Sequence, residues 1–114
     1  MSFSYTISKE KGYVHLCLKG NLMNKQQIEG MLAELDFFYN EGVNKIIIDL
    51  SDMLYMNSTG LSILINIFTK TRSRGGEVVI TNIPEKINKL LVITKLNSIF
   101  NIENSVEDAK KILV

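Results

Sequence analysis

The sequence predicts an α/β fold in which helices cover a mostly parallel sheet. Short apolar segments with strand character alternate along the chain with segments whose apolar residues recur at helical spacing. Two strand-like segments come first and are separated by a glycine, which indicates an antiparallel pair at the start of the sheet. We expect about four to five strands, about four helices and right-handed crossovers between the parallel strands.

The chain opens with a predicted hairpin. Apolar and polar residues alternate over 3–7 and indicate a first strand, after which Gly12 marks a turn. A second strand is predicted over 13–19, because the apolar residues Val14, Leu16 and Leu18 fall on one face.

The first helix is predicted to begin after Asn24. Asn24 is a good N-cap residue, and Gln27 stands three residues later, which is the spacing of a capping box. The helix should end at Glu41-Gly42. Its apolar face is predicted to consist of Ile28, Met31, Leu32, Leu35 and Phe38.

A small polar cluster at 57–60 lies between a predicted strand and a predicted helix. The apolar run 43–48 indicates a buried strand, and the helix after the cluster extends to about Ser73. Sites in parallel sheets collect at the carboxyl ends of the strands, so we expect this cluster and the turn at 20–24 on the same rim. A helix N-terminus there offers free N–H groups and partial positive charge.

The last third of the chain predicts shorter elements. A buried strand is expected over 77–82, and Pro84 fits the first position of a short helix. A short final strand is predicted over 99–102. Ser105 and Asp108 then have the spacing of a cap before a last helix.

Composition excludes several classes of protein. With 114 residues, 46% of them hydrophobic, the chain is expected to form one domain over 1–114. A net charge of +1 without a basic stripe argues against nucleic-acid binding. The single Cys17 excludes an internal disulfide and a multi-cysteine zinc site, and we expect no cofactor or metal. Neither a signal-peptide pattern nor a bilayer-spanning apolar run is present, so we expect a soluble cytoplasmic protein without direct membrane insertion.

Two interpretations of Ser58 follow from its setting. In the first, Asn57 caps the helix, a role that typically contributes about 1 kcal/mol, and residues 58–60 fill the first turn. In the second, Ser58 is a phosphoacceptor, since a phosphate is tolerated at a helix N-terminus while it changes the sign of the surface. Gly60 would then let a partner approach the first turn closely.

A resemblance to a known family is carried by the segment Asp49-Leu-Ser-Asp-Met-Leu-Tyr-Met-Asn57-Ser58-Thr59-Gly60-Leu61. It resembles the motif of the STAS domain, the family of bacterial anti-sigma factor antagonists, in which Asp-Leu-Ser ends a hydrophobic strand and Asp-Ser-Ser/Thr-Gly-Leu follows a short spacer. Gly20-Asn-Leu and Gly75-Gly76-Glu77 are similar to glycine motifs at the end of the second and before the fourth strand of that family.

The resemblance implies a regulator of transcription without catalytic activity. In the family, the unphosphorylated domain binds an anti-sigma factor that is also a serine kinase, and a separate phosphatase resets it. Carried over by residue, the phosphoacceptor is Ser58, with Thr59 as the second candidate. The partner-binding residues that we expect are Met23, Asn24, Tyr55, Met56, Asn57, Ser58, Thr59 and Gly60.

Two positions depart from the family pattern. The family usually has Asp at the position of Asn57 and often has Asp at that of Met23. These departures motivate an alternative in which the chain is a non-phosphorylated STAS scaffold or a small subunit of a transport or signalling complex. The oligomeric state stays open.

His15 and Cys17 provide a third hypothesis, an enzyme. They stand at i and i+2 of a predicted strand, so they share a face and suit a nucleophile–base pair. The sequence shows no third group to orient them, and a buried Cys17 would exclude this chemistry.

Overall fold

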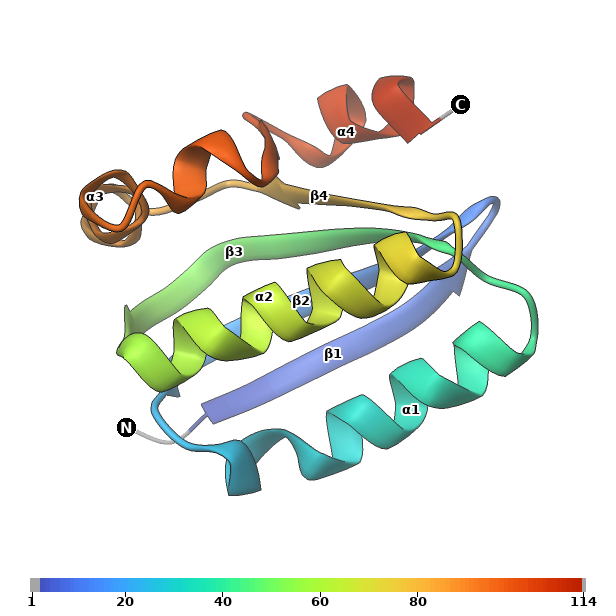
Figure 1. Ribbon diagram of the computed structural model, residues 1–114, viewed down its shortest axis with the longest axis horizontal. Helices are drawn as coiled ribbons and strands as arrows, with labels where there is room; N and C mark the ends of the chain where they lie inside the picture. Colours follow the sequence, from blue (N-terminus) through green and yellow to red (C-terminus); the bar gives the residue numbers. More distant parts are fainter. Residues whose placement is uncertain (1–2, 114) are drawn as a thin grey trace.

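Five strands form the sheet at the centre of the molecule (Figure 1). The structure is a computed structural model that describes residues 3–113. The strands of the described chain are β1 (Phe3–Glu10), β2 (Tyr13–Leu22), β3 (Lys45–Met56), β4 (Glu77–Thr81) and β5 (Asn101–Glu103). The α-helices are α1 (Glu29–Asn40), α2 (Ser58–Ser73), α3 (Glu85–Ile93) and α4 (Val106–Leu113), and short 3-10 turns are η1 (Lys25–Ile28) and η2 (Leu96–Ser98).

The strands lie side by side in the order of the sequence, β1-β2-β3-β4-β5. β1 and β2 pair antiparallel, and every later neighbour pairs parallel. Each parallel neighbour is reached through a helix, as a crossover requires. The predicted fold class, a mixed and mostly parallel sheet with an N-terminal antiparallel pair, is therefore confirmed.

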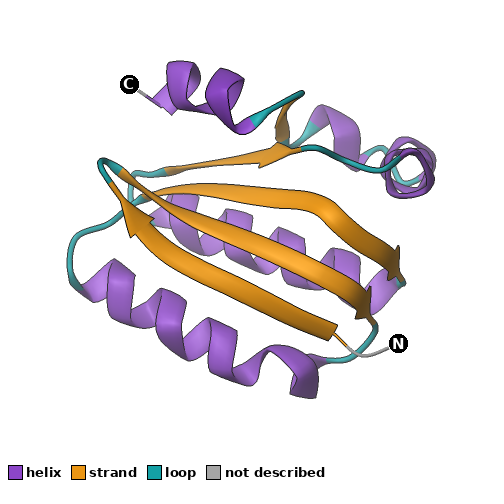
Figure 2. Cartoon of the chain, turned by 180° about the vertical axis from the view of Figure 1, so that it is seen from behind, coloured by secondary structure: helices purple, strands orange, loops and turns teal. Residues whose placement is uncertain are grey.

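The two faces of the sheet are covered unequally. α1 and α2 pack on one face, which carries the main core (Figure 1). Seen from behind, no helix of the described chain lies in front of β1 and β2, and α4 lies beside β4 (Figure 2). α4 buries Ala109 and Leu113 against Ile47 and Val79 in a smaller cluster.

The main core follows the alternation of the central strands. Its fully buried side chains come from β2, β3, α1 and α2 and include Leu16, Leu18, Ile46, Ile48, Met31, Leu35, Leu64 and Ile67. Burying such side chains contributes about 1.5–3 kcal/mol each. The packing of α2 in this core determines where the helix begins along the sheet, and therefore where the 57–60 cluster lies.

β3 is much longer than the sequence predicts. The strand was expected over 43–48, but it continues through the segment expected as a loop to Met56. After Leu50 its buried residues recur at every third position, Met53 and then Met56, so the two-residue alternation of a strand is lost. Irregularities in the β2–β3 register allow this spacing, because bulges shift which residues face the core.

The local signals for the helix starts are largely confirmed. The capping box of Asn24 and Gln27 forms, with Gln27 N–H donating to Asn24 Oδ1 at 3.2 Å and Asn24 N–H donating to Gln27 Oε1 at 3.0 Å. It caps η1, and α1 continues from Glu29. Pro84 precedes α3 as its N-cap residue, one position earlier than predicted. No helix among residues 3–113 is long and apolar enough to cross a membrane.

Candidate functional site

The 57–60 cluster lies on the rim formed by the carboxyl ends of β2 and β3. The two strands are parallel, so the turn after Leu22 and the turn after Met56 meet at the same edge of the sheet. Asn57 N–H donates to the carbonyl oxygen of Leu22 at 3.4 Å, which joins the two turns. The predicted proximity of the 20–24 turn and the cluster is confirmed.

Asn57 holds this rim together with both ends of its side-chain amide. Its Oδ1 accepts from Gly60 N–H at 3.0 Å, which caps α2, and its Nδ2 donates to the carbonyl oxygen of Met23 at 3.1 Å. An ionised aspartate has no donor and cannot make the second bond. The Asn at this position therefore has a structural reason that the sequence does not reveal.

Gly60 and Met56 lie in the interior and not on the partner-facing surface where we expected them. Met56 is only 2% exposed. A Cβ at Gly60 would lie 2.5 Å from Met56 Cγ and 2.8 Å from the carbonyl oxygen of Leu22, both too close. Gly60 is thus required for the close approach of α2 to the sheet. Its predicted role, to give a partner access to the first turn, is wrong.

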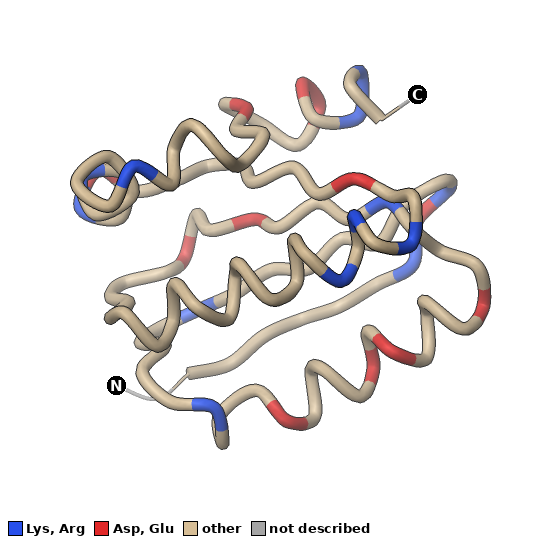
Figure 3. Tube along the Cα trace, viewed as in Figure 1, with Lys and Arg blue, Asp and Glu red and all other residues tan. Residues whose placement is uncertain are grey.

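Ser58 begins α2 and is exposed. Its carbonyl oxygen accepts from the Ser62 hydroxyl at 3.0 Å, while its own hydroxyl makes no hydrogen bond within residues 3–113. Thr59 is half-buried. From Ser58 to Thr69 the helix carries no charged residue, and its lysine and arginine residues lie at the other end (Figure 3). A charge added at Ser58 would dominate this end of α2.

Large apolar side chains surround Ser58 on the rim. Met23 is 46% exposed, Leu54 is 54% exposed and Tyr55 is 52% exposed. Exposed apolar side chains that cluster beside polar groups are typical of protein-docking surfaces. We call this set the Ser58 surface: Met23, Asn24, Leu54, Tyr55, Asn57, Ser58 and Thr59. Leu54 was missed from the sequence because the segment was expected as a loop.

A hollow of about 470 Å³ lies between the start of α2 and α3, and we call it the α2–α3 hollow. Its lining joins four members of the Ser58 surface to the apolar face of α3 and to one cation, Lys86. The lining residues are Leu54, Tyr55, Met56, Asn57, Ser58, Lys86, Ile87 and Leu90. α3 thus lines the same hollow as Ser58, which the sequence did not predict.

His15 and Cys17 share one face of β2, as predicted, and the structure adds Asp49. His15 Nε2 lies 3.5 Å from Asp49 Oδ2 but makes no hydrogen bond to any described residue. Cys17 is only 9% exposed, and burial, followed by the charge of Asp49, raises the pKa of its thiol. A buried thiol that stays protonated is a poor nucleophile, so the geometry excludes the enzyme hypothesis at this pair.

Asp49 is held as a carboxylate by its neighbours. Burial opposes its charge, but hydrogen bonds outweigh that cost and lower the pKa of Asp49 below its usual value. Ser51 N–H donates to Oδ1 at 3.0 Å, and Asn82 Nδ2 donates to the same atom at 3.2 Å. Asp49 therefore ties β3 to the end of β4. Within residues 3–113 no group of three His, Cys, Asp or Glu side chains could hold a metal ion.

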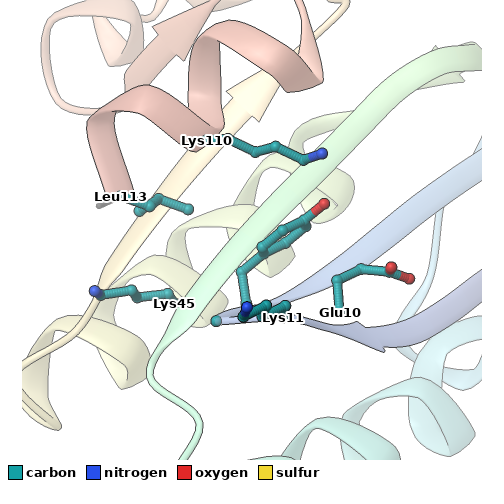
Figure 4. Close-up of a pocket in the computed structure, with 7 residues that line it drawn as sticks. Glu10, Lys11, Lys45, Lys110 and Leu113 are labelled. Atoms are coloured by element: carbon teal, nitrogen blue, oxygen red, sulfur yellow. The ribbon is translucent and has the colours of Figure 1, made fainter.

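A second hollow lies at the opposite end of the sheet, between the β1–β2 hairpin and α4 (Figure 4). Its lysines do not converge. Lys45 and Lys110 point in opposite directions (Figure 4). Lys110 is paired with Glu107 at 3.2 Å and lies over the ring of Tyr13. The hollow therefore has lysines, as an anion-binding site would, but their ammonium groups do not point toward one another (Figure 4).

Comparison with known proteins identifies relatives over nearly the whole chain. The STAS domain model matches residues 12–109. A Bordetella bronchiseptica protein described as a candidate anti-sigma factor antagonist, BtrV, is 29% identical over 104 residues, which cover 91% of this chain and 89% of that protein.

Solved structures show the same fold. The crystal structure of a candidate anti-sigma factor antagonist from Thermotoga maritima has a TM-score of 0.80 and 27% sequence identity, and the match covers 97% of this chain and 93% of that chain. The Bacillus cell fate determinant SpoIIAA in its phosphorylated form has a TM-score of 0.74, with 96% of this chain and 99% of that chain covered. At 15% identity, that likeness shows the fold alone.

Proposed function

This chain belongs to the STAS domain family, and from that premise we propose that it is an anti-sigma factor antagonist switched by phosphorylation at Ser58. The observation that carries the proposal is the exposed Ser58 hydroxyl at the start of α2, with no hydrogen-bond partner in the described chain and with apolar side chains around it. Thr59 is the second candidate acceptor, and its half-buried position makes it the poorer one.

The general role is supported by the relatives. BtrV and the Thermotoga maritima protein are both described as candidate anti-sigma factor antagonists, which are binding proteins and not enzymes. The name of such a protein implies an anti-sigma factor as its partner. For this chain we propose a partner that is also a serine kinase, and a separate phosphatase that removes the phosphate. A serine kinase needs ATP, which is supplied in the cytoplasm, so we propose that the switch acts there.

The chemistry of the switch is a simple phosphoryl transfer from ATP. The Ser58 oxygen forms a bond to the γ-phosphorus, the bond from that phosphorus to the β–γ bridging oxygen breaks, ADP leaves and the hydroxyl proton is released. Gly60 N–H donates to the Asn57 side chain, so the N–H groups of Ser58 and Thr59 are the ones at the helix start that can stabilise the negative charge of the phosphate. The fold is expected to tolerate the phosphate.

Loss of binding would follow from the apolar setting of Ser58. A phosphoserine carries about −1.5 to −2 charges at neutral pH. When Leu54 and Tyr55 are covered by a partner, that charge would have to lose much of its water, which is costly. Phosphorylation therefore changes the surface and leaves the backbone in place.

Intact-mass measurement after incubation with the anti-sigma kinase, ATP and Mg²⁺ tests the acceptor. We expect one phosphoryl group on the wild type, none on Ser58→Ala and one on Thr59→Ala. Binding of the same partner, measured by calorimetry, should be lost in Ser58→Asp and kept in Ser58→Ala. No phosphate on the wild type, together with unchanged binding of Ser58→Asp, would overturn the switch.

A second function is favoured by Asn57 alone. Because its amide is used in two structural hydrogen bonds, the residue is explained without a kinase, which suits a scaffold or a small subunit of a transport or signalling complex. Pull-down from the native host separates the two. Recovery of transporter or other complex subunits, without an anti-sigma kinase, would favour the scaffold.

A further inference from the structure

We propose that Lys86 is the internal counter-ion of phosphorylated Ser58, and that the α2–α3 hollow receives the phosphoryl group. The inference rests on the proposed modification of Ser58, and it adds the residue that pairs with the phosphate, the hollow that holds it and a consequence for partner binding. It starts from one observation, that Ser58 and Lys86 line the same hollow although they come from different helices.

Lys86 is available for this role. It is exposed and makes no ion pair within residues 3–113. Lys89, on the same helix, is instead paired with Glu85 at 3.7 Å. The carboxylate nearest to Lys86 in sequence is therefore engaged with Lys89, and the ammonium group of Lys86 remains free for another anion.

The hollow itself lacks any competing negative charge. None of its described lining residues is a carboxylate, and apart from Lys86 its one ionisable group is the phenol of Tyr55. Leu54, Ile87 and Leu90 make its walls largely apolar, which strengthens the attraction between opposite charges relative to open water. A phosphate on Ser58 would find its cation on Lys86 and its hydrogen-bond donors at the start of α2.

The pairing would let one phosphorylation change two charges on the docking surface. In the unmodified protein, Lys86 is a free cation at the edge of an apolar hollow, and it suits a partner that brings an apolar side chain flanked by an acidic group. Phosphorylation would add a negative charge at Ser58 and at the same time withdraw the positive charge of Lys86. A partner with that acidic group would lose its ion pair and meet repulsion in its place.

The test uses the full chain with phosphoserine incorporated at position 58 during translation, so it needs no kinase. Titration followed by ³¹P NMR gives the pKa of the second phosphate ionisation. A nearby cation favours the dianion and lowers that pKa, so Lys86→Gln should raise the titration midpoint by a few tenths of a pH unit. Lys89→Gln removes the same charge from the same helix and should leave the midpoint in place.

A midpoint that is the same in Lys86→Gln and in the otherwise unsubstituted phosphoprotein would overturn the proposal. Equal shifts in Lys86→Gln and Lys89→Gln would overturn it as well, because they would show only the distant effect of net charge. Circular dichroism of the two variants checks the fold. If the pairing is found but the kinase never modifies Ser58, the proposed function fails and this inference survives, so the two failures are distinguishable.

Discussion

Replacement of Asn57 by Ala removes the two hydrogen bonds that hold the rim, and the loss can be worked from the structure. The cap to Gly60 N–H is worth about 1 kcal/mol. The bond to the Met23 carbonyl adds about 0.5–1 kcal/mol, at the lower end of its range because water can replace the donor. We expect Asn57→Ala to lower the free energy of unfolding by about 1.5–2 kcal/mol.

Urea unfolding followed by circular dichroism measures this loss, with an unchanged dependence on denaturant as the sign that the folded state is intact. Asn57→Asp keeps the acceptor for Gly60 N–H and lacks the donor, so it should lose only the smaller part. Asn66→Ala is the matched control, since Asn66 is exposed on the same helix. If Asn57→Ala and Asn66→Ala unfold at the same urea concentration, the Asn57 side chain does not hold the rim together.

Two further predictions concern packing and pH. Gly60→Ala should destabilise the fold by about 1–3 kcal/mol because the added Cβ meets Met56 and Leu22. Gly30→Ala, on the exposed face of α1 with its nearest contact at 3.5 Å, should instead stabilise the fold by about 0.5–1 kcal/mol. Thermal unfolding compares the two variants, and equal shifts in their melting temperatures would show that packing at Gly60 does not matter. The lowered pKa of Asp49 contributes stability that is present above the usual value of 3.8 and is lost as the pH falls through the folded-state pKa. The free energy of unfolding of the Asp49→Asn variant should therefore fall less steeply at acid pH than that of the wild type. An equally steep fall in the two proteins would contradict this prediction.

Local signals predicted much of this molecule correctly. The capping box of Asn24 and Gln27, the cap of Asn57 and the start and end of α2 each depend on residues close together in the chain, and each is found. The order of strands and helices followed from the change of apolar spacing along the chain. These features need no knowledge of what packs against what.

Features that depend on packing were not predicted. β3 continues to Met56 because bulges in its pairing with β2 change the period of burial, which a search for strict alternation cannot detect. The contact of Gly60 with the end of β2 and the neighbourhood of Ser58 and Lys86 join segments far apart in the sequence. The sequence placed Ser58, but it did not reveal the hollow beside it.

The amide of Asn57 joins the turn after β2 to the first turn of α2, and this has a kinetic consequence. The two segments that we propose as the docking surface are already held at their mutual distance before a partner arrives. Association then requires little loss of backbone freedom, so a modest contact area can give useful affinity. Encounter would limit the speed of complex formation, and the lifetime of the complex would be the quantity that a phosphate shortens.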